Sequence, residues 1–211
     1  KGQLLILDAV HRLRDQGVDV HVSFVGDGPM RPAMERRIAE LKLGRSIEFL
    51  GWQASGRVRE LLAGSTALVI ASAAEGLPVV AMESLAVGCP VIATNVAAMS
   101  ELIEDRHCGW LISAGSTEHL ADAMRCASQC DAETLVQMGL QGRQRVLELH
   151  HPQRQSEALH NLLLAASQKP ATARESANAA DRGYPRRGGA GSPTPAAAVG
   201  PQLPPAVALD R

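Results

Sequence analysis

The chain has 211 residues, of which 45% are hydrophobic and only 2% aromatic, and its formal net charge is −1. This length suits one large domain or two small ones, and the near-neutral charge gives no electrostatic reason to expect nucleic acid as a partner. No apolar run reaches the roughly 20 residues that span a bilayer. We therefore expect a cytoplasmic protein that contacts a membrane peripherally at most, with a core of Leu, Val, Ile and Ala.

Apolar periodicity predicts alternating helices and strands over the first 166 residues. The expected helices cover residues 4–13, 30–43 and 57–63, the segment from Pro78 to Gly88, and residues 100–104, 118–128, 132–149 and 153–166. The expected strands cover residues 18–25, 47–51, 67–71, 91–94 and 109–112. This order predicts an α/β fold with a parallel sheet covered by helices on both faces. Ligands of such sheets bind at the carboxyl ends of the strands.

The composition changes at residue 167. Residues 167–211 are rich in Ala, Pro, Gly and Arg and contain no Phe, Trp or Ile. A segment of this kind buries too little apolar surface to become ordered by itself. We therefore expect a globular domain over residues 1–166 and a disordered low-complexity tail over residues 167–211, to which we assign no function.

Two carboxylates flank the start of one predicted helix. Glu75 follows the apolar strand at 67–71, and Glu83 lies inside the next helix, after Gly76-Leu77-Pro78. Helix N-termini favour anions such as phosphate, and carboxylates accept hydrogen bonds from sugar hydroxyls. The pattern therefore indicates a site for a polyhydroxylated anion. Two exposed glutamates beside a helix start are the alternative, but burying Glu83 among apolar neighbours without a partner would be costly, which favours a function.

The two carboxylates are part of a longer sequence motif. Residues 75–94 contain E-G-x-P-x-x-x-x-E, small residues, G-x-P, an apolar strand and Thr94. This run resembles the nucleotide-sugar signature of family-4 glycosyltransferases of the GT-B fold. The resemblance extends from Lys1-Gly2, through Gly26-Asp27-Gly28-Pro29 and Phe49-Leu50-Gly51, to the helix near His151. It implies a Rossmann-like parallel sheet that forms the C-terminal half of a GT-B fold.

The resemblance also implies roles for individual residues. Glu75 would contact hydroxyls of the donor sugar, and the amides of Gly76 and Leu77 would face the distal phosphate or the sugar. Glu83 would hold the ribose hydroxyls. Lys1, matching the lysine of the family's K-G motif, would neutralise the diphosphate during catalysis, although as the first residue it could equally have no role.

Three further positions lie near this predicted site. By the resemblance, Gly26 and Gly28 line the donor pocket, although a simple tight turn is the alternative. Trp52 either stacks on the nucleotide base or is an ordinary half-buried tryptophan. Ala97 and Ala98 replace paired glycines of the family loop near the donor. Because alanine disfavours positive φ, we expect an altered loop there.

The function implied is retaining hexosyl transfer from a nucleoside-diphosphate sugar to a glycan or lipid-linked acceptor, as in polysaccharide biosynthesis. No cofactor is expected, and no metal, because the four cysteines form no C-x-x-C pair. The base, the sugar and the acceptor stay open.

Two parts of the family's fold are expected outside this sequence: an amino-terminal domain that holds the acceptor, and a central strand ahead of the first helix. We therefore expect the chain alone to be inactive and poorly stable. A truncated inactive remnant that at most binds a nucleotide or a partner is the alternative function. A GT-B epimerase of nucleotide sugars is a third reading that fits residues 75–90 less well.

Overall fold

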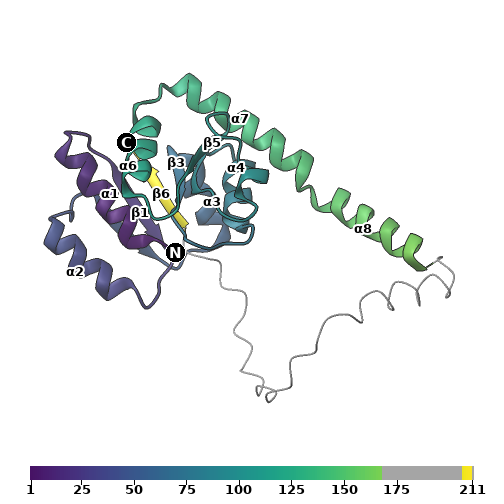
Figure 1. Cartoon of the computed structure of the whole chain (residues 1–211), viewed down its shortest axis with the longest axis horizontal. Coiled ribbons are helices and arrows are strands. Elements are labelled where there is room, and N and C mark those ends of the chain that lie inside the picture. The colour runs from purple at the N-terminus through teal and green to yellow at the C-terminus, as the bar shows by residue number, and fades with distance from the viewer. Residues whose placement is uncertain (168–205, 211) are drawn as a thin grey trace, which may run out of the picture. The chain divides into compact units, whose positions relative to one another are not determined.

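The computed structural model describes residues 1–167 and 206–210. They fall into two units, residues 1–149 with 206–210, and residues 150–167. The strands of the first unit are β1 (His21–Val25), β2 (Ile47–Gly51), β3 (Ala67–Ile70), β4 (Val91–Thr94), β5 (Gly109–Ile112) and β6 (Ala206–Asp210) (Figure 1). Its helices are α1 (Gln3–Asp15), α2 (Arg31–Leu41), α3 (Ser55–Gly64), α4 (Val79–Ala86), α5 (Met99–Leu102), α6 (Thr117–Gln129) and α7 (Ala132–Leu149), and the second unit contains α8 (Pro152–Ser167).

The strands form one sheet in the order β2-β1-β6-β3-β4-β5. The pairs β1–β2, β3–β4 and β4–β5 are parallel, whereas β6 is antiparallel to both of its neighbours. Helices cover both faces of the sheet in Figure 1. The predicted α/β architecture with a largely parallel sheet is therefore confirmed.

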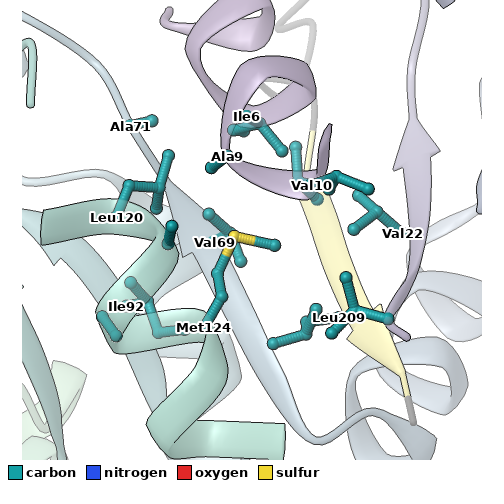
Figure 2. Packing of buried hydrophobic residues seen from close by; sticks show 14 of the residues in the cluster. Ile6, Ala9, Val10, Val22, Val69, Ala71, Ile92, Leu120, Met124 and Leu209 are labelled. Carbon is teal, nitrogen blue, oxygen red and sulfur yellow. The ribbon is translucent and has the colours of Figure 1, made fainter. Parts of the chain in front are cut away.

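Two apolar layers hold the helices on the sheet. On one face α1, α2 and α6 pack on alternate strand residues, and Figure 2 shows Val69 between Ile6 of α1 and Met124 of α6. On the other face α3, α4, α5 and α7 pack on the intervening residues, such as Leu68. Successive strand residues point to opposite faces, so the continuous apolar run in β3 serves both layers.

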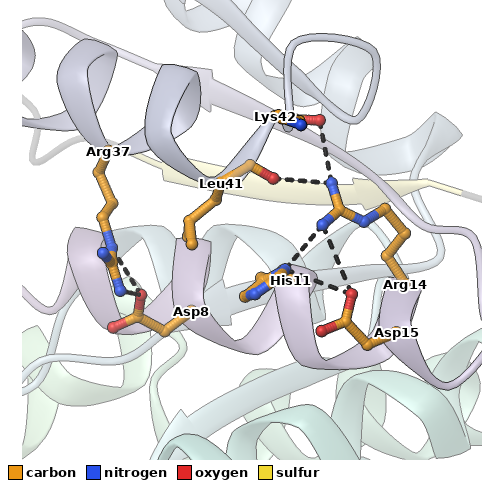
Figure 3. A network of polar contacts seen from close by, with 7 residues as sticks. All are labelled: Asp8, His11, Arg14, Asp15, Arg37, Leu41 and Lys42. Carbon is orange, nitrogen blue, oxygen red and sulfur yellow. Dashed lines mark hydrogen bonds and ion pairs between the residues drawn. The ribbon is translucent and has the colours of Figure 1, made fainter.

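Polar contacts join α1 to α2 at the rim of the first layer. Arg37 donates to Asp8 Oδ1 at 2.7 Å, and Arg14 Nη1 donates to the carbonyl oxygens of Leu41 and Lys42 at 2.7 and 3.0 Å (Figure 3). The last carbonyls of a helix have no partner within the helix. Arg14 therefore caps α2 and fixes it against α1.

The first strand begins later than the sequence predicts. β1 starts at His21 rather than Val18, because the Val18 amide donates to the carbonyl of Leu13 at 3.0 Å. Gly17 makes this closing turn of α1 with a φ of 75°. Such a turn needs a left-handed residue, which glycine adopts readily.

The prediction of a disordered tail is wrong for residues 206–210. β6 pairs with β1 over five residue pairs and with β3 over two. Its three central side chains, Val207, Ala208 and Leu209, are buried. Composition describes the segment in isolation, whereas the sheet supplies partners for its backbone on two sides and apolar layers on both faces. The predicted tail also begins one residue early, since α8 ends at Ser167; residues 168–205 and 211 lie outside the described residues.

β6 also occupies a position in the sheet that was predicted for another strand. The central place in the sheet was expected to belong to a strand ahead of α1. In the structure β6 fills this place between β1 and β3, with the opposite direction. The sheet is therefore continuous from β2 to β5.

Candidate functional site

The structure brings Lys1 and Glu75 together at the carboxyl end of β3. Lys1 Nζ lies 2.5 Å from Glu75 Oε1, although 74 positions separate the residues in the sequence. The Glu75 side chain is 12% exposed and that of Lys1 is 44% exposed. The carboxylate is thus fixed in the wall of the site, while the ammonium group faces solvent.

Gly2 explains how Lys1 reaches this position. It precedes α1 with a φ of 76°, and a Cβ atom placed on it would lie 2.0 Å from the carbonyl oxygen of Ala71. No other residue tolerates both the left-handed backbone and this approach. The start of α1 therefore packs directly on the end of β3, which sets Lys1 beside Glu75.

Ser72 and Thr94 hold Glu75 in position through two successive hydrogen bonds. Ser72 Oγ donates to Glu75 Oε1 at 2.7 Å, and Thr94 Oγ1 donates to the carbonyl oxygen of Ser72 at 2.5 Å. Both hydroxyl side chains are buried. Neither residue was assigned a role from the sequence. The sequence signal that could have identified them is a hydroxyl residue near the end of each of two apolar strands, β3 and β4, which pair with each other.

The surroundings keep Glu75 ionised. Burial of the carboxyl group opposes ionisation, but hydrogen bonds from Lys1 and Ser72, together with the charge of Lys1, outweigh burial and lower the pKa of Glu75 below its usual value. Within the described residues, both hydrogen bonds go to Oε1. Oε2 therefore remains available to accept bonds from a ligand.

Glu83 differs from Glu75 in its surroundings. It lies in α4, one turn after Val79, and is half-buried, as Glu75 is. In the part of the chain that the structure describes, its side chain has no hydrogen bond or ion pair. Its desolvation is therefore smaller than the sequence suggested, and its carboxylate is free for a ligand.

The start of α4 lies between the two glutamates. The residue before it, Pro78, provides no side-chain cap for the first turn, so amide groups there lack a side-chain acceptor. Gly76 is exposed, and a Cβ atom on it would meet nothing within 4 Å. Leu77 packs against the second apolar layer. The helix start is thus open to an anion from the side of Gly76.

A cavity of about 270 Å³ adjoins Lys1. The loop after β1 contributes Gly26 and Gly28 to its wall, and Phe49 of β2 lies opposite. Gly26 adopts a φ of 105° and its amide donates to the carbonyl of Gly51 at 2.7 Å. The structure therefore brings this glycine turn to the same pocket as Lys1.

Arg31 closes one side of this cavity. Its guanidinium carbon lies 4.6 Å from the centre of the Phe49 ring, and it pairs with Glu35 at 2.9 Å. Trp52, the residue proposed for base stacking, is 53% exposed and is not among the lining residues. The aromatic surface in the cavity comes from Phe24 and Phe49, whose ring centroids are 5.6 Å apart.

One of the two alanines at the family's glycine positions has a left-handed backbone conformation. Ala97 has a φ of 48°, whereas Ala98 has an ordinary φ of −87°. The left-handed region costs a non-glycine residue roughly 1–2 kcal/mol. The backbone at Ala97 is therefore strained, whereas Ala98 is not; the change in loop shape stays a prediction.

Neither a metal centre nor a membrane span is evident in the described segments. Across residues 1–167 and 206–210, no three His, Cys, Asp or Glu side chains are placed to hold a metal ion. No helix among these residues is both long and apolar enough to cross a bilayer.

A family comparison agrees with this geometry. The model of the family described as "Glycosyl transferases group 1" matches residues 1–145. The chain belongs to this family. The identification as a GT-B glycosyltransferase is therefore confirmed, and the candidate site lies wholly within the matched residues.

Several relatives of the chain are described as glycosyltransferases. The putative colanic acid biosynthesis glycosyltransferase WcaL of Escherichia coli (strain K12) is 29% identical over 171 residues, which are 78% of this chain and 42% of WcaL. The amylovoran biosynthesis glycosyltransferase AmsK of Erwinia amylovora is 28% identical over 141 residues, 64% of this chain and 35% of AmsK. The chain thus spans less than half the length of these relatives.

A solved structure shares the fold. HepE of Anabaena, crystallised in complex with UDP-glucose, superposes with a TM-score of 0.66 and 24% identity, covering 76% of this chain and 45% of HepE. At this level of identity the likeness concerns the fold, and it supports the arrangement of helices and strands described above.

Proposed function

We propose that this chain is the donor-binding part of a family-4 glycosyltransferase that retains anomeric configuration. It binds a nucleoside-diphosphate sugar, from which a hexosyl group passes to a glycan or lipid-linked acceptor. The observation that carries the proposal is the Lys1–Glu75 pair, held by Ser72 beside the open start of α4. Cation, carboxylate and helix start together match a phosphate joined to a sugar.

In this proposal different residues bind different parts of the donor. Glu75, ionised and fixed, accepts bonds from sugar hydroxyls through Oε2, each worth about 1.5–3 kcal/mol. Glu83, with no partner among the described residues, accepts the ribose hydroxyls. The amides that follow Gly76 and Leu77 face the distal phosphate. Lys1, which is largely solvent-facing, turns from Glu75 to the diphosphate as the donor binds.

Catalysis then follows from charge and position. The bond between the anomeric carbon and the diphosphate oxygen breaks, and the acceptor hydroxyl forms a new bond on the same face. Its proton passes to the departing diphosphate. The Lys1 ammonium and the amides at the start of α4 stabilise the charge that develops on the leaving group. No protein nucleophile, metal or cofactor is required in this scheme.

The setting proposed is polysaccharide biosynthesis in the cytoplasm, as the names of WcaL and AmsK suggest for those relatives. The acceptor site belongs to a further domain, since the chain spans less than half of these proteins. The chain alone therefore binds the donor without completing transfer.

Thermal melting of the chain with UDP, GDP or ADP tests the donor site. A nucleotide at 100 times its dissociation constant adds about 2.7 kcal/mol of stability. For a chain of this size that corresponds to a rise in Tm of about 5–10 °C. We expect one nucleotide to raise Tm, and Glu83→Ala to abolish the rise without lowering the Tm of the free chain.

Glu60→Ala is the matched control, because Glu60 is an exposed helical glutamate on α3 outside the site. It should leave the nucleotide response intact. If no nucleotide raises the Tm of a cooperatively melting chain, the proposed donor site does not exist. A response retained in Glu83→Ala would instead remove Glu83 from the site.

A further inference from the structure

Helix α7 has apolar side chains on two opposite faces. Its inner face is buried in the first unit and consists of Met138, Gly139, Gly142 and Val146. Its outer face carries an apolar stripe, 46% to 58% exposed, that consists of Val136, Leu140 and Leu147. A helix on the surface of a domain usually has a single apolar stripe, which faces the core. A second, exposed stripe indicates an interaction surface.

The inner face holds α7 firmly against α4. A Cβ atom on Gly139 would lie 2.1 Å from the carbonyl oxygen of Gly88, and one on Gly142 would lie 2.6 Å from the side chain of Leu85. Residues two apart in a helix point to nearly opposite sides, so Leu140 lies opposite Gly142. The stripe is therefore turned outward, away from α4.

Two charges of opposite sign lie on either side of the centre of this stripe. Steps of three, four and three residues separate Glu133, Val136, Leu140 and Arg143. This is the spacing of a coiled-coil seam. Both charged side chains are exposed, and neither forms an ion pair or a side-chain hydrogen bond within the described residues. The outer face thus presents an apolar pair between one acid and one base.

This pattern is complementary to itself when it is reversed. In an antiparallel pair of helices, Val136 of each copy lies against Leu140 of the other. In the same register Glu133 lies against Arg143. Because the spacing is symmetric, one register makes both contacts, and a two-fold axis repeats them. A parallel pair would instead place the two Glu133 carboxylates at the same level, and likewise the two Arg143 guanidinium groups, where like charges repel.

We propose that the outer face of α7 is an interface between two copies of this chain, which pair through antiparallel α7 helices. The occupant is a second copy because the exposed charges flank the apolar pair with opposite sign and equal spacing. A single pair of helices buries less than the roughly 800 Å² per partner of a standard interface. The dimer is therefore weak, with a dissociation constant on the order of 10 µM.

Charge exchange in the full chain tests both the surface and the register. Sedimentation equilibrium measures dimerisation from about 1 to 500 µM, a range that brackets the expected constant. Glu133→Arg and Arg143→Glu should each weaken the dimer at least about 10-fold, because two ion pairs become two repulsions. An equimolar mixture of the two variants should dimerise again, since each copy then faces the charge that it lacks.

Leu140→Glu tests the apolar contact, and Gln141→Glu is its matched control. Both positions are exposed on α7 and both changes add one negative charge, but residue 141 lies beside the stripe. Leu140→Glu should weaken the dimer at least about 10-fold, since it places a carboxylate against an aliphatic side chain. The control should change the dissociation constant less than about 3-fold. Circular dichroism shows whether each variant keeps its helical content.

Each result of these experiments supports or overturns the proposal. Dimers that are lost in both charge variants and return on mixing support it. A chain that stays monomeric at about 500 µM has no such interface. A dimer that Leu140→Glu leaves intact forms through another face, and folded charge variants that do not recombine exclude the antiparallel register; both overturn the proposal. Because the stripe faces away from α4, nucleotide should raise the Tm of Leu140→Glu as much as that of the unmodified chain, so the test is separate from that of the donor site.

Discussion

Replacing Ser72 by alanine measures how much its hydrogen bond to Glu75 contributes to stability. The change removes the hydroxyl that donates to Glu75 Oε1 at 2.7 Å, while the carbonyl of residue 72 still accepts from Thr94. A hydrogen bond to a charged group contributes about 1.5–3 kcal/mol. Because Lys1 still holds the same oxygen, we expect the lower end, a loss of about 1.5 kcal/mol in the free energy of unfolding at pH 7.

The pH dependence distinguishes this mechanism from simple loss of packing. The pKa of Glu75 is lowered in the folded chain, so its ionised form contributes stability above the usual carboxyl value, and this stability is lost as pH falls through the lowered pKa. Removing Ser72 removes one cause of that lowering. The difference between the wild-type chain and Ser72→Ala should therefore shrink as the pH falls through the lowered pKa of Glu75 and the carboxylate becomes protonated.

Urea unfolding at pH 7 and at acidic pH measures this difference. Ser84→Ala is the matched control: Ser84 is also buried, but its hydroxyl donates to a neutral group, the carbonyl of Cys89, at 3.0 Å. Its loss should stay at about 1 kcal/mol throughout. If Ser72→Ala and Ser84→Ala show the same loss at both pH values, Ser72 does not act through the Glu75 carboxylate.

Four backbone positions give further predictions, all measured as free energies of unfolding. Gly2→Ala should cost at least about 3 kcal/mol, because the added Cβ would lie 2.0 Å from a backbone oxygen at a φ of 76°; an unchanged stability would show that α1 does not start against β3. Ala97→Gly should raise stability by about 1 kcal/mol by relieving the φ of 48°, and a loss would contradict that strain. Gly139→Ala should cost about 2 kcal/mol or more, since its Cβ would meet a backbone oxygen at 2.1 Å. Gly56→Ala, in open space on α3, should instead gain about 0.5–1 kcal/mol.

The apolar patterns of the sequence predicted most of the helices and strands, because each pattern depends only on residues that are close together in the sequence. The apolar run at 67–71 and the helix after Pro78 each bury a continuous surface, and both appear close to the expected limits in β3 and α4. Periodicity of this kind reports burial directly. It also placed Glu75 at a strand end, where parallel sheets bind ligands.

What the sequence could not predict depends on contacts between distant residues. The apolar centre of β6 is only three residues long, Val207 to Leu209, and becomes a strand because β1 and β3 lie on either side of it. The role of Ser72 depends likewise on Thr94 in the neighbouring strand. Neither partner is visible from composition or from short-range spacing, because both interactions arise only once the sheet has formed.

The Lys1–Glu75 pair combines a fixed carboxylate with an exposed cation, as the proposed donor site requires. A half-buried carboxylate alone would raise its own pKa and lose its charge, but Lys1 and Ser72 keep Glu75 ionised. Lys1 is the exposed member of the pair, so solvent weakens its bond to Glu75. In the proposed donor complex Lys1 exchanges this bond for one to the diphosphate. Ser72 is buried and remains, so the carboxylate keeps its orientation while its cation moves. The division between a buried fixed partner and an exposed mobile one therefore lets one carboxylate serve both the fold and the proposed transfer.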